Sequence, residues 1–339
     1  MTLAAEIDEV TVNFSQSSLT LLSVVLAFIM FGIALDTAPK DFRVVATHPR
    51  PFVIAIAAQL LVLPAITFVL TLILPVTASM ALGMLLVACC PPGNISQVLT
   101  HRAGGNVALS VSMTAVSNLI YIAALPLSIS FWGSLHPEAG DLLTDVHLEP
   151  IKMLVEIALV IGVPFALGLT LRAAYPRIAD RVQPFVKWVG LLALVGFILA
   201  ALVSNWNVFV THLGIILVVV AIHDAVALAI GWGTAAVGGL GTRERKAMTF
   251  EVGIRNAGLG LGLVMTFFDG LGGMAVVAGW WGVWDIISGL ILATAWGRHT
   301  RRKTGSDKGD ATSRSAIGQR RQRISADGDS TDSTDREVS

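Results

Sequence analysis

Charged side chains are scarce in this sequence. Asp, Glu, Lys and Arg make up 14% of the 339 residues, and hydrophobic residues make up 54%. A soluble globular domain has about 25% charged residues. The formal net charge is zero, so bulk electrostatics favour no nucleic-acid partner. The composition excludes an ordinary soluble domain and predicts a polytopic membrane protein surrounded by a lipid bilayer.

Cysteine is nearly absent, and basic residues are missing from the start of the chain. The two cysteines, Cys89 and Cys90, are neighbours; this excludes a disulfide framework, and two neighbours alone do not make a metal site. Residues 1–18 contain no Lys or Arg, whereas a cleavable signal peptide begins with positive charge. We therefore predict an extracellular N-terminus at 1–18, followed by a retained first span.

Nine apolar segments are long enough to cross a bilayer, which takes about 20 residues. The runs do not alternate between apolar and polar residues, so the predicted fold class is all-α and strands are excluded. The transmembrane domain is predicted at 19–303. Its spans are residues 19–37, 51–73, 80–102, 107–132, 151–173, 185–205, 211–236, 247–269 and 275–297.

The linkers at 74–79, 133–150, 206–210 and 270–274 contain no Lys or Arg, whereas basic residues lie in or at the edge of the other linkers and follow the ninth span. Lys152 departs from this pattern, but it lies at a helix end where its side chain can reach the membrane surface. The positive-inside rule therefore places the N-terminus outside the cell and the C-terminus in the cytoplasm, and the protein in a cell (plasma or inner) membrane. Residues 304–339 mix charges with Ser, Thr and Gly, so a disordered cytoplasmic tail is predicted there. In the acidic linker 133–150, His136 and His147 are expected to be solvated.

Residues that break helices interrupt two of the predicted spans. Pro91 and Pro92 lie in CCPPGNISQ of the third span, where proline disfavours a continuous helix. The eighth span contains FEVGIRNAGLG, in which Glu251 and Arg255 are charged and Gly253 allows unwinding. Ionisable groups at membrane depth usually face a cavity, a partner or an ion, and paired broken segments mark transporter binding sites. We predict that two broken helices cross at mid-membrane around the carboxylate.

Polar side chains near these breaks supply oxygen atoms. Ser110 and Thr114 are four residues apart and share one face of the fourth span; each residue taken alone fits an interhelical hydrogen bond equally well. With Glu251 and nearby amide oxygens they form the kind of oxygen-rich site that suits Na⁺. Asp224 and Asp285 also lie at membrane depth, so a role for protons stays open.

These motifs resemble the bile acid:sodium symporter family. CCPPGNISQ followed by GNVALSVSMT is similar to the family pattern at its first crossover, and EVGIRN is similar to the pattern at the second. FIMFGIALDTAPKDF, AAQLLVLP around Gln59 and His223 extend the resemblance over about residues 20–300. The resemblance implies the nine-span form of an inverted-repeat fold in which a core moves against a panel.

The resemblance also assigns roles along the chain. It implies a panel of residues 19–37, 151–173 and 185–205 and a core of 51–73, 80–102, 107–132, 211–236, 247–269 and 275–297. It implies one Na⁺ site at Ser96, Gln97, Ser110, Thr114 and Glu251, and a second at Gln59, Glu251, Val252, Ile254 and Arg255. It places a small organic anion near Asn94 and Asn256, with Arg255 as a further candidate.

Three positions depart from the family pattern: Gln97 replaces Asn, Pro92 replaces Gly and Arg255 replaces Gln. The first keeps an amide oxygen and the second keeps the break. The third puts the second Na⁺ site in question, because a permanent cation cannot bind Na⁺ and repels it. Arg255 either points at Glu251 and stands in for the second Na⁺, which we favour, or pairs with an anionic substrate.

The sequence therefore predicts a secondary active transporter that takes up an organic anion (bile-acid-like, a keto acid or another small carboxylate or sulfonate) with Na⁺. The alternative is a proton-coupled or Na⁺-independent organic anion carrier in which Arg255 replaces the second sodium. A cation/proton antiporter is disfavoured because the companion of Glu251 is Arg255 and not a carboxylate. An enzyme is not predicted because no nucleophile–base set or metal cluster is visible, and a receptor is not predicted because no sizeable soluble domain is visible.

Overall fold

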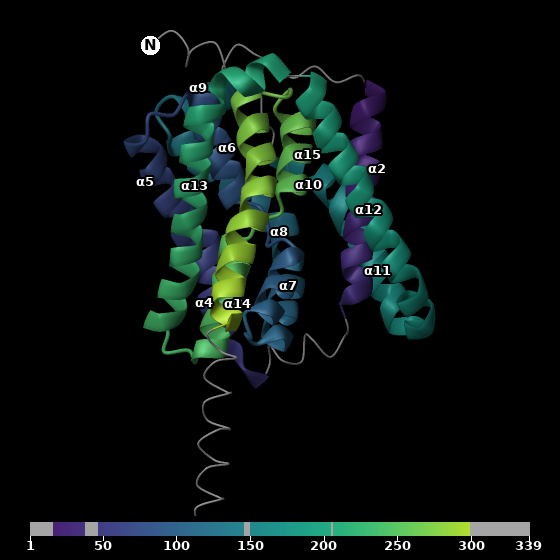
Figure 1. The fold of residues 1–339 in the computed structure, drawn as a ribbon. Coiled ribbons are helices and arrows are strands. Elements are labelled where there is room, and N and C mark those ends of the chain that lie inside the picture. The colour runs from purple at the N-terminus through teal and green to yellow at the C-terminus, as the bar shows by residue number, and fades with distance from the viewer. Residues whose placement is uncertain (1–15, 38–46, 146–149, 205, 299–339) are drawn as a thin grey trace, which may run out of the picture.

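The computed structural model describes residues 16–37, 47–145, 150–204 and 206–298, and these are helical apart from turns and one isolated β-bridge (Figure 1). Each predicted span overlaps one helix or two or three consecutive helical segments. Among the described residues, five helical stretches are long and apolar enough to cross a membrane: Pro49–Ile73, Val107–Leu135, Leu154–Ala174, Gly214–Val237 and Gly272–Arg298. The prediction of an all-helical polytopic membrane protein is confirmed, while the count of nine spans and the inverted repeat stay predictions.

The helices follow one another along the chain in this order: α2 (Gln16–Asp36), α4 (Pro49–Ala57), the π-helical turn η1 (Ala58–Val62), α5 (Leu63–Ile73), α6 (Ala78–Ala88), α7 (Ile95–Arg102), α8 (Val107–Leu135), α9 (Ala139–Asp145), α10 (Pro150–Ile157), the π-helical turn η2 (Ala158–Gly162), α11 (Val163–Ala174), α12 (Pro176–Ser204), α13 (Trp206–Val237), α14 (Thr242–Gly253), α15 (Ala257–Phe267) and the last helix, Gly272–Arg298.

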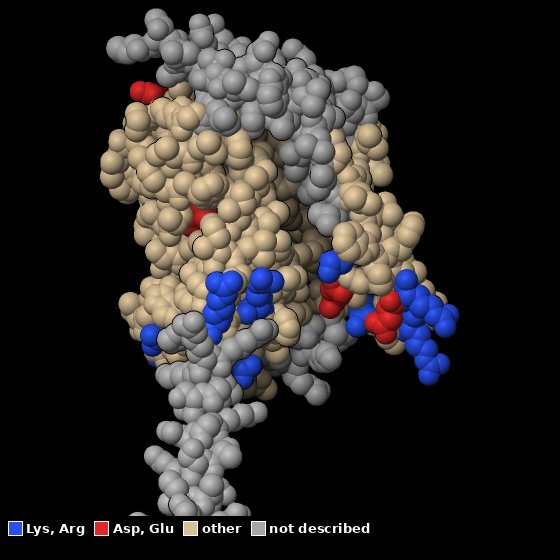
Figure 2. All heavy atoms as spheres, in the orientation of Figure 1, with Lys and Arg blue, Asp and Glu red and all other residues tan. Residues whose placement is uncertain are grey.

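Three helices, α2, α11 and α12, form a group of their own beside the main bundle (Figure 1). They share a small apolar core that contains Leu35, Ala179 and Val186. In the main bundle α13 packs along α14, and α7 and α8 also contact α14. Figure 2 shows the surface hollowed between the three-helix group and the main bundle, and shows Lys and Arg gathered toward one end of the molecule. The two groups also touch, because Met30 and Ala34 of α2 and Phe165 of α11 belong to the same buried apolar cluster as the main bundle.

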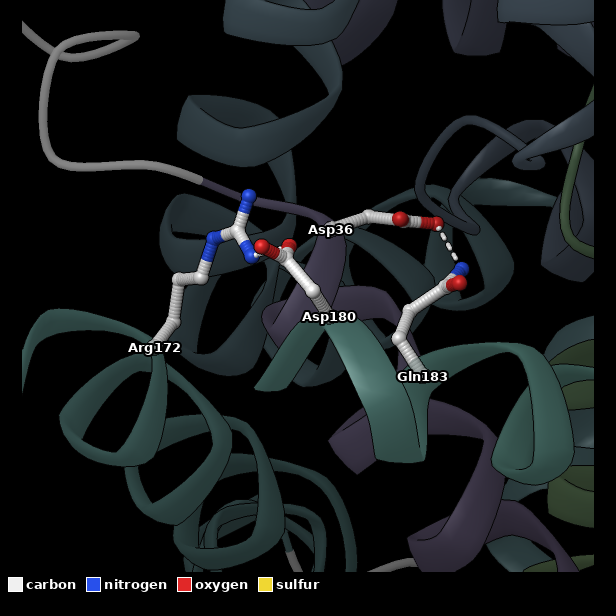
Figure 3. A network of polar contacts seen from close by, with 4 residues as sticks. All are labelled: Asp36, Arg172, Asp180 and Gln183. Carbon is white, nitrogen blue, oxygen red and sulfur yellow. Dashed lines mark hydrogen bonds and ion pairs between the residues drawn. The ribbon is translucent and has the colours of Figure 1, made fainter. Parts of the chain in front are cut away.

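Polar contacts tie the three-helix group together at that end (Figure 3). Arg172 of α11 forms an ion pair with Asp180 of α12, and Gln183 of α12 donates a hydrogen bond of 2.7 Å to Asp36, the last residue of α2. The side chains of this ion pair are 22% and 66% exposed, so water screens their attraction. The apolar contacts beneath it are therefore expected to stabilise the group more than the ion pair does.

The two π-helical turns each end two residues before a proline. Proline has no N–H to donate to the carbonyl four residues earlier, and the preceding N–H reaches back five residues instead: Leu63 to Ala58, and Val163 to Ala158. Single π turns inside α-helices are frequent at functional sites. The first of them, η1, contains Gln59, which is fully buried.

The linker at 133–150 differs from its prediction. His136, expected to be solvated, is only 6% exposed. Its Nδ1 accepts a hydrogen bond of 3.2 Å from the N–H of Ala139, at the start of α9, and its ring lies edge-on to Phe68. The prediction was wrong because α9 folds back over the end of α8 and covers the ring. His147, residues 1–15 and the predicted tail at 304–339 lie outside the described residues.

Candidate functional site

The two predicted breaks are present, and they lie side by side. Residues 89–94 separate α6 from α7, and residues 254–256 separate α14 from α15. The N–H of Gly93 donates a hydrogen bond of 3.0 Å to the carbonyl of Ile254, and the N–H of Asn256 donates one of 2.9 Å to the carbonyl of Pro91. Backbone groups freed by one break are thus satisfied by the other, as groups buried away from water must be.

Glycines permit this close approach. A Cβ added to Gly93 would lie 3.1 Å from the carbonyl oxygen of Arg255. A Cβ added to Gly231 of α13 would lie 2.7 Å from the Cα of Thr249 in α14. Both distances are tighter than ordinary van der Waals contact between carbon or oxygen atoms. The absence of a side chain at these two positions therefore sets how deeply α14 and its break lie in the bundle.

Three hydroxyl groups surround the carboxylate of Glu251 beside the breaks. Ser96 of α7 donates to its Oε1 at 2.6 Å, and Ser110 of α8 donates to the same atom at 2.5 Å. The hydroxyl of Thr114 lies 3.0 Å from Oε1 and 2.9 Å from Oε2. All four residues are at most 1% exposed. The fold brings predicted oxygen ligands from α7 and α8 to one buried carboxylate on α14.

Gln59 of η1 connects Glu251 to neighbouring segments through hydrogen bonds. Its Nε2 donates to the backbone carbonyl of Glu251 at 3.3 Å, and its Oε1 accepts a hydrogen bond of 2.8 Å from Ser117 of α8. The hydroxyl of Tyr121 donates to the Gln59 carbonyl at 3.1 Å. Ser117 and Tyr121 were missed in the sequence, although Ser117 follows Ser110 by seven residues and so shares its helix face. The regular spacing of polar residues in α8 was the available signal.

Arg255 is oriented differently from the favoured prediction. Its Nη1 donates a hydrogen bond of 3.1 Å to the carbonyl of Cys90, and no ion pair within 4 Å joins it to Glu251 among the described residues. The prediction that Arg255 points at Glu251 was wrong, because the extended backbone of the break turns the two side chains to different neighbours. Cys90 follows the end of α6, so the guanidinium lies at the carbonyl end of that helix, where a cation is favourable.

The remaining predicted residues are more scattered. Gln97 is half-buried on α7 and makes no hydrogen bond to the carboxylate among the described residues. Asn94 is exposed at the start of α7, while Asn256 is half-buried and its side chain accepts a hydrogen bond from Leu259 at the start of α15. Val252 is buried. The carbonyl of Ile254, also a predicted ligand, is already hydrogen-bonded to Gly93.

The oxygen atoms around Glu251 fit a monovalent hard cation. The two carboxylate oxygens and the three hydroxyls of Ser96, Ser110 and Thr114 form a set of five. No basic side chain pairs with this carboxylate within 4 Å in the described part of the chain. Oxygen ligands with a single negative charge suit Na⁺. The groups of the second predicted site, in contrast, are largely engaged with one another or with Cys90.

Comparison with known families agrees with this geometry. The sequence profile of the Sodium Bile acid symporter family matches residues 23–212, more than half of the chain. The chain belongs to the Sodium Bile acid symporter family. It is therefore a multi-pass membrane protein of a sodium-coupled transporter family, and not an enzyme.

Relatives of this chain within the Sodium Bile acid symporter family come from bacteria, plants and animals. The chain is 30% identical over 290 residues to an uncharacterized sodium-dependent transporter, YocS, of Bacillus subtilis, covering 85% of this chain and 86% of the relative. It is 27% identical over 248 residues to a probable sodium/metabolite cotransporter of rice chloroplasts, covering 73% of this chain and 57% of the relative. It is 25% identical over 245 residues to the human ileal sodium/bile acid cotransporter, covering 71% and 67%.

Proposed function

We propose that this protein takes up a small organic anion together with Na⁺ by alternating access, and that Glu251, Ser96, Ser110 and Thr114 bind the coupling ion. The observation that carries the proposal is the fully buried carboxylate, which is surrounded by three hydroxyls and is not paired with a basic side chain among the described residues. A buried charge is costly unless it is compensated. A cation that enters from water supplies this compensation.

The hydroxyl groups provide a simple way to accept the ion. In the structure the hydroxyls of Ser96 and Ser110 donate to Glu251, and each oxygen keeps lone pairs that can face a cation. Rotation of the O–H bonds lets the same oxygens face Na⁺ while the carboxylate supplies the negative charge. Thr114 also donates to the carbonyl of Ser110 at 3.1 Å, so it keeps a partner for its proton in either state.

Substrate recognition is proposed at the helix ends beside the breaks. The N-termini of α7 and α15 adjoin the crossover, and helix N-termini favour negative charge. Asn94 is exposed at the first of these ends, and Asn256 caps the second. A carboxylate or sulfonate would thus meet partial positive charge without displacing Na⁺, with Arg255 adding a full positive charge nearby. The names of the relatives, which include bile acid and metabolite cotransporters, support an organic anion.

Movement is proposed between two bodies of a nine-span, inverted-repeat fold. The three-helix group of α2, α11 and α12, with α10 and η2, corresponds to the predicted panel, and the main bundle corresponds to the predicted core. The hollow between them (Figure 2) supports relative movement. The basic residues at one end of the molecule support a cytoplasmic C-terminus in a cell membrane.

The deciding experiment measures binding and uptake in two steps. A thermal-shift screen of bile acids, keto acids and sulfonates in Na⁺ and in K⁺ buffer identifies an anion that stabilises the protein. Uptake of that anion into proteoliposomes is then measured with an inward Na⁺ gradient and with an equal K⁺ gradient. We expect accumulation only with Na⁺; equal uptake in both would exclude symport with Na⁺.

A matched pair of variants tests the ion site itself. Ser110→Ala removes a hydroxyl that contacts Glu251, whereas Ser112→Ala removes a buried hydroxyl of the same helix that donates to the carbonyl of Ala108. We expect Ser110→Ala to abolish stabilisation by Na⁺ and Ser112→Ala to retain it. Loss of the Na⁺ response in both variants, or in neither, contradicts the proposed site.

A second candidate function follows from Arg255. Arg255 is 2% exposed and is one of the residues of the second predicted Na⁺ site. Other groups of that site are already hydrogen-bonded: Gln59 donates to the carbonyl of Glu251, and the carbonyl of Ile254 accepts from Gly93. A fixed cation there would leave one coupling ion, or a carrier that uses protons and ignores Na⁺. Uptake that follows a pH gradient and is indifferent to Na⁺ would favour this candidate.

A further inference from the structure

Asn118 of α8 is a buried amide whose two polar atoms are both unsatisfied. The residue is 3% exposed, and neither its Oδ1 nor its Nδ2 has a hydrogen-bond partner among the described residues. Buried polar side chains are nearly always hydrogen-bonded, because burying such a group without a partner costs free energy. An amide in this setting indicates that a ligand pairs with it at some stage of the protein's work.

Asn118 continues the polar row of the proposed sodium site along α8. It lies one helical turn after Thr114 and two turns after Ser110, and the hydroxyls of both contact the carboxylate of Glu251. Its neighbour Ser117 donates to Gln59 instead. Four residues of an α-helix span about 6 Å along its axis. The amide is therefore next to the ion site without being part of it.

The next turn of α8 meets the side of the molecule that corresponds to the predicted panel. Ile122 follows Asn118 by four residues, and a Cβ added to Gly162 of η2 would lie 3.5 Å from the Cδ1 of Ile122, which is ordinary van der Waals contact. Residues four apart are rotated by only about 40° around an α-helix. Asn118 thus lies on the buried face of α8 between Thr114, which faces Glu251, and Ile122, which faces η2.

The turn η2 also borders a pocket between the panel side and the main bundle. The residues that line it include Leu26 of α2, Glu156 of α10, Ile161 of η2 and Thr266 of α15. The helices are therefore not closely packed along this part of η2, and π turns are frequent at functional sites. A displacement of η2 relative to α8, as in the proposed movement of the panel, would give a ligand access to Asn118.

We propose that Asn118 hydrogen-bonds the transported anion, and that this anion also carries a hydroxyl or amide N–H group. This inference rests on the proposed function and specifies its substrate. The Nδ2 atom of an amide donates hydrogen bonds and the Oδ1 atom accepts them. Na⁺ would satisfy only Oδ1, and a bare carboxylate or sulfonate would satisfy only Nδ2. A ligand with both an acceptor and a donor satisfies the whole amide.

Cysteine labelling tests whether a ligand reaches this position. The reagent is sulfonatoethyl methanethiosulfonate, a small organic sulfonate, and the full-length protein has Cys89 and Cys90, its two native cysteines, replaced by alanine. Asn118→Cys is compared with Leu125→Cys, a residue of the same helix that is 1% exposed and belongs to the apolar core. We expect Asn118→Cys to react about tenfold faster, because a core thiol is reached only by local unfolding. Equal rates, measured by intact mass, overturn the proposal.

Asn118→Leu tests the hydrogen bonds separately from the fold. Leucine has a similar size and no polar atom, so replacing an unsatisfied amide should leave the midpoint of thermal unfolding unchanged or raise it. Stabilisation by Na⁺ should remain, because the oxygen atoms around Glu251 are untouched. The probes are two pairs of acids that differ in hydroxyl groups, lactate with propionate and cholate with cholanate. We expect the wild-type protein to prefer the hydroxylated acid of at least one pair by about tenfold, and the variant to lose this preference.

The outcomes separate this proposal from the proposed function. A lower unfolding midpoint in Asn118→Leu shows that the amide has a structural partner, and loss of the Na⁺ response shows that it binds the ion; either result overturns the proposal. A wild-type protein that binds no probe, or binds both acids of each pair equally, overturns the assignment of a substrate with a donor group. Uptake that ignores Na⁺ would refute the proposed symport, whereas the labelling rates and the preference for hydroxyl groups would still decide the role of Asn118.

Discussion

The N–H of Gly93 donates a hydrogen bond of 3.0 Å to the carbonyl of Ile254, and it joins the two broken helices at the centre of the molecule. A reciprocal bond runs from the N–H of Asn256 to the carbonyl of Pro91 at 2.9 Å. The pair resembles a minimal antiparallel bridge, here between Pro92 and Arg255. These hydrogen bonds satisfy N–H and C=O groups of the unwound backbone at a membrane depth where water cannot do so. They also fix the position of Glu251 beside α8.

Gly93→Val should loosen this crossover. The added side chain would collide with the carbonyl of Arg255, because even a Cβ would lie 3.1 Å from that oxygen. We expect a loss of about 1–3 kcal/mol of stability, read as a lower midpoint of thermal unfolding in detergent. Gly233→Ala in α13 is the control, since nothing lies within 4 Å of its added Cβ. Equal midpoints for the two variants would contradict the close approach.

Thr114→Val should weaken the sodium response while preserving side-chain shape. The hydroxyl lies within 3.0 Å of both carboxylate oxygens of Glu251, and valine replaces it with a methyl group. We expect at least a tenfold loss of Na⁺ affinity, which corresponds to about 1.4 kcal/mol, in a Na⁺ titration followed by thermal shift. Thr114→Ser retains the oxygen and should retain the response. A Na⁺ affinity unchanged in the valine variant would exclude Thr114 as a ligand.

Arg255→Gln should change how many sodium ions the protein binds. The substitution removes a fixed cation and leaves an amide oxygen next to the carbonyl of Cys90, to which Arg255 now donates. If the guanidinium stands in for a second ion, the Na⁺ titration becomes steeper in the variant than in the wild-type protein. Arg255→Lys keeps the charge and should keep the shallow curve. Identical curves for wild type and the glutamine variant would show that this position does not govern the number of ions.

His136 should make stability depend on pH. Burial lowers the pKa of its imidazole below the usual value of 6.5, and its Nδ1 must be unprotonated to accept from Ala139. The folded protein thus binds fewer protons here than the unfolded chain, so the stability from this residue is present above about pH 6.5 and falls as the pH drops below it. His136→Gln keeps an acceptor that does not titrate. The stability difference between wild type and variant should shrink from pH 8 toward pH 5, measured by thermal unfolding; a constant difference would contradict the buried neutral imidazole.

Asp180→Asn should have little effect on the three-helix group. The ion pair with Arg172 is partly exposed, and such pairs contribute about 1 kcal/mol or less. Leu35→Ala, in the apolar core of the same group, removes a side chain that is fully buried. We expect it to destabilise by about 2 kcal/mol or more, because the cavity remains even where lipid replaces water as the surroundings. A larger loss for Asp180→Asn than for Leu35→Ala would show that the polar network, and not packing, holds the group together.

The order of apolar and helix-breaking residues along the chain predicts much of the fold. Long apolar runs have to become helices in a membrane because their backbone groups must pair within the segment. Pro91 and Pro92 interrupt one helix wherever it lies, since the missing N–H is a local property. The side-chain chemistry of Ser110, Thr114 and Glu251 also indicates a carboxylate with oxygen atoms around it.

The contacts between distant segments were decided only by the tertiary structure. The direction of Arg255 depends on the extended backbone of its break and on the end of α6, which brings the carbonyl of Cys90 within 3.1 Å. The burial of His136 depends on α9 folding over it. Local sequence determines which groups are present and which helices break. Packing determines which of those groups meet, because each meeting is fixed by the shapes of several helices at once.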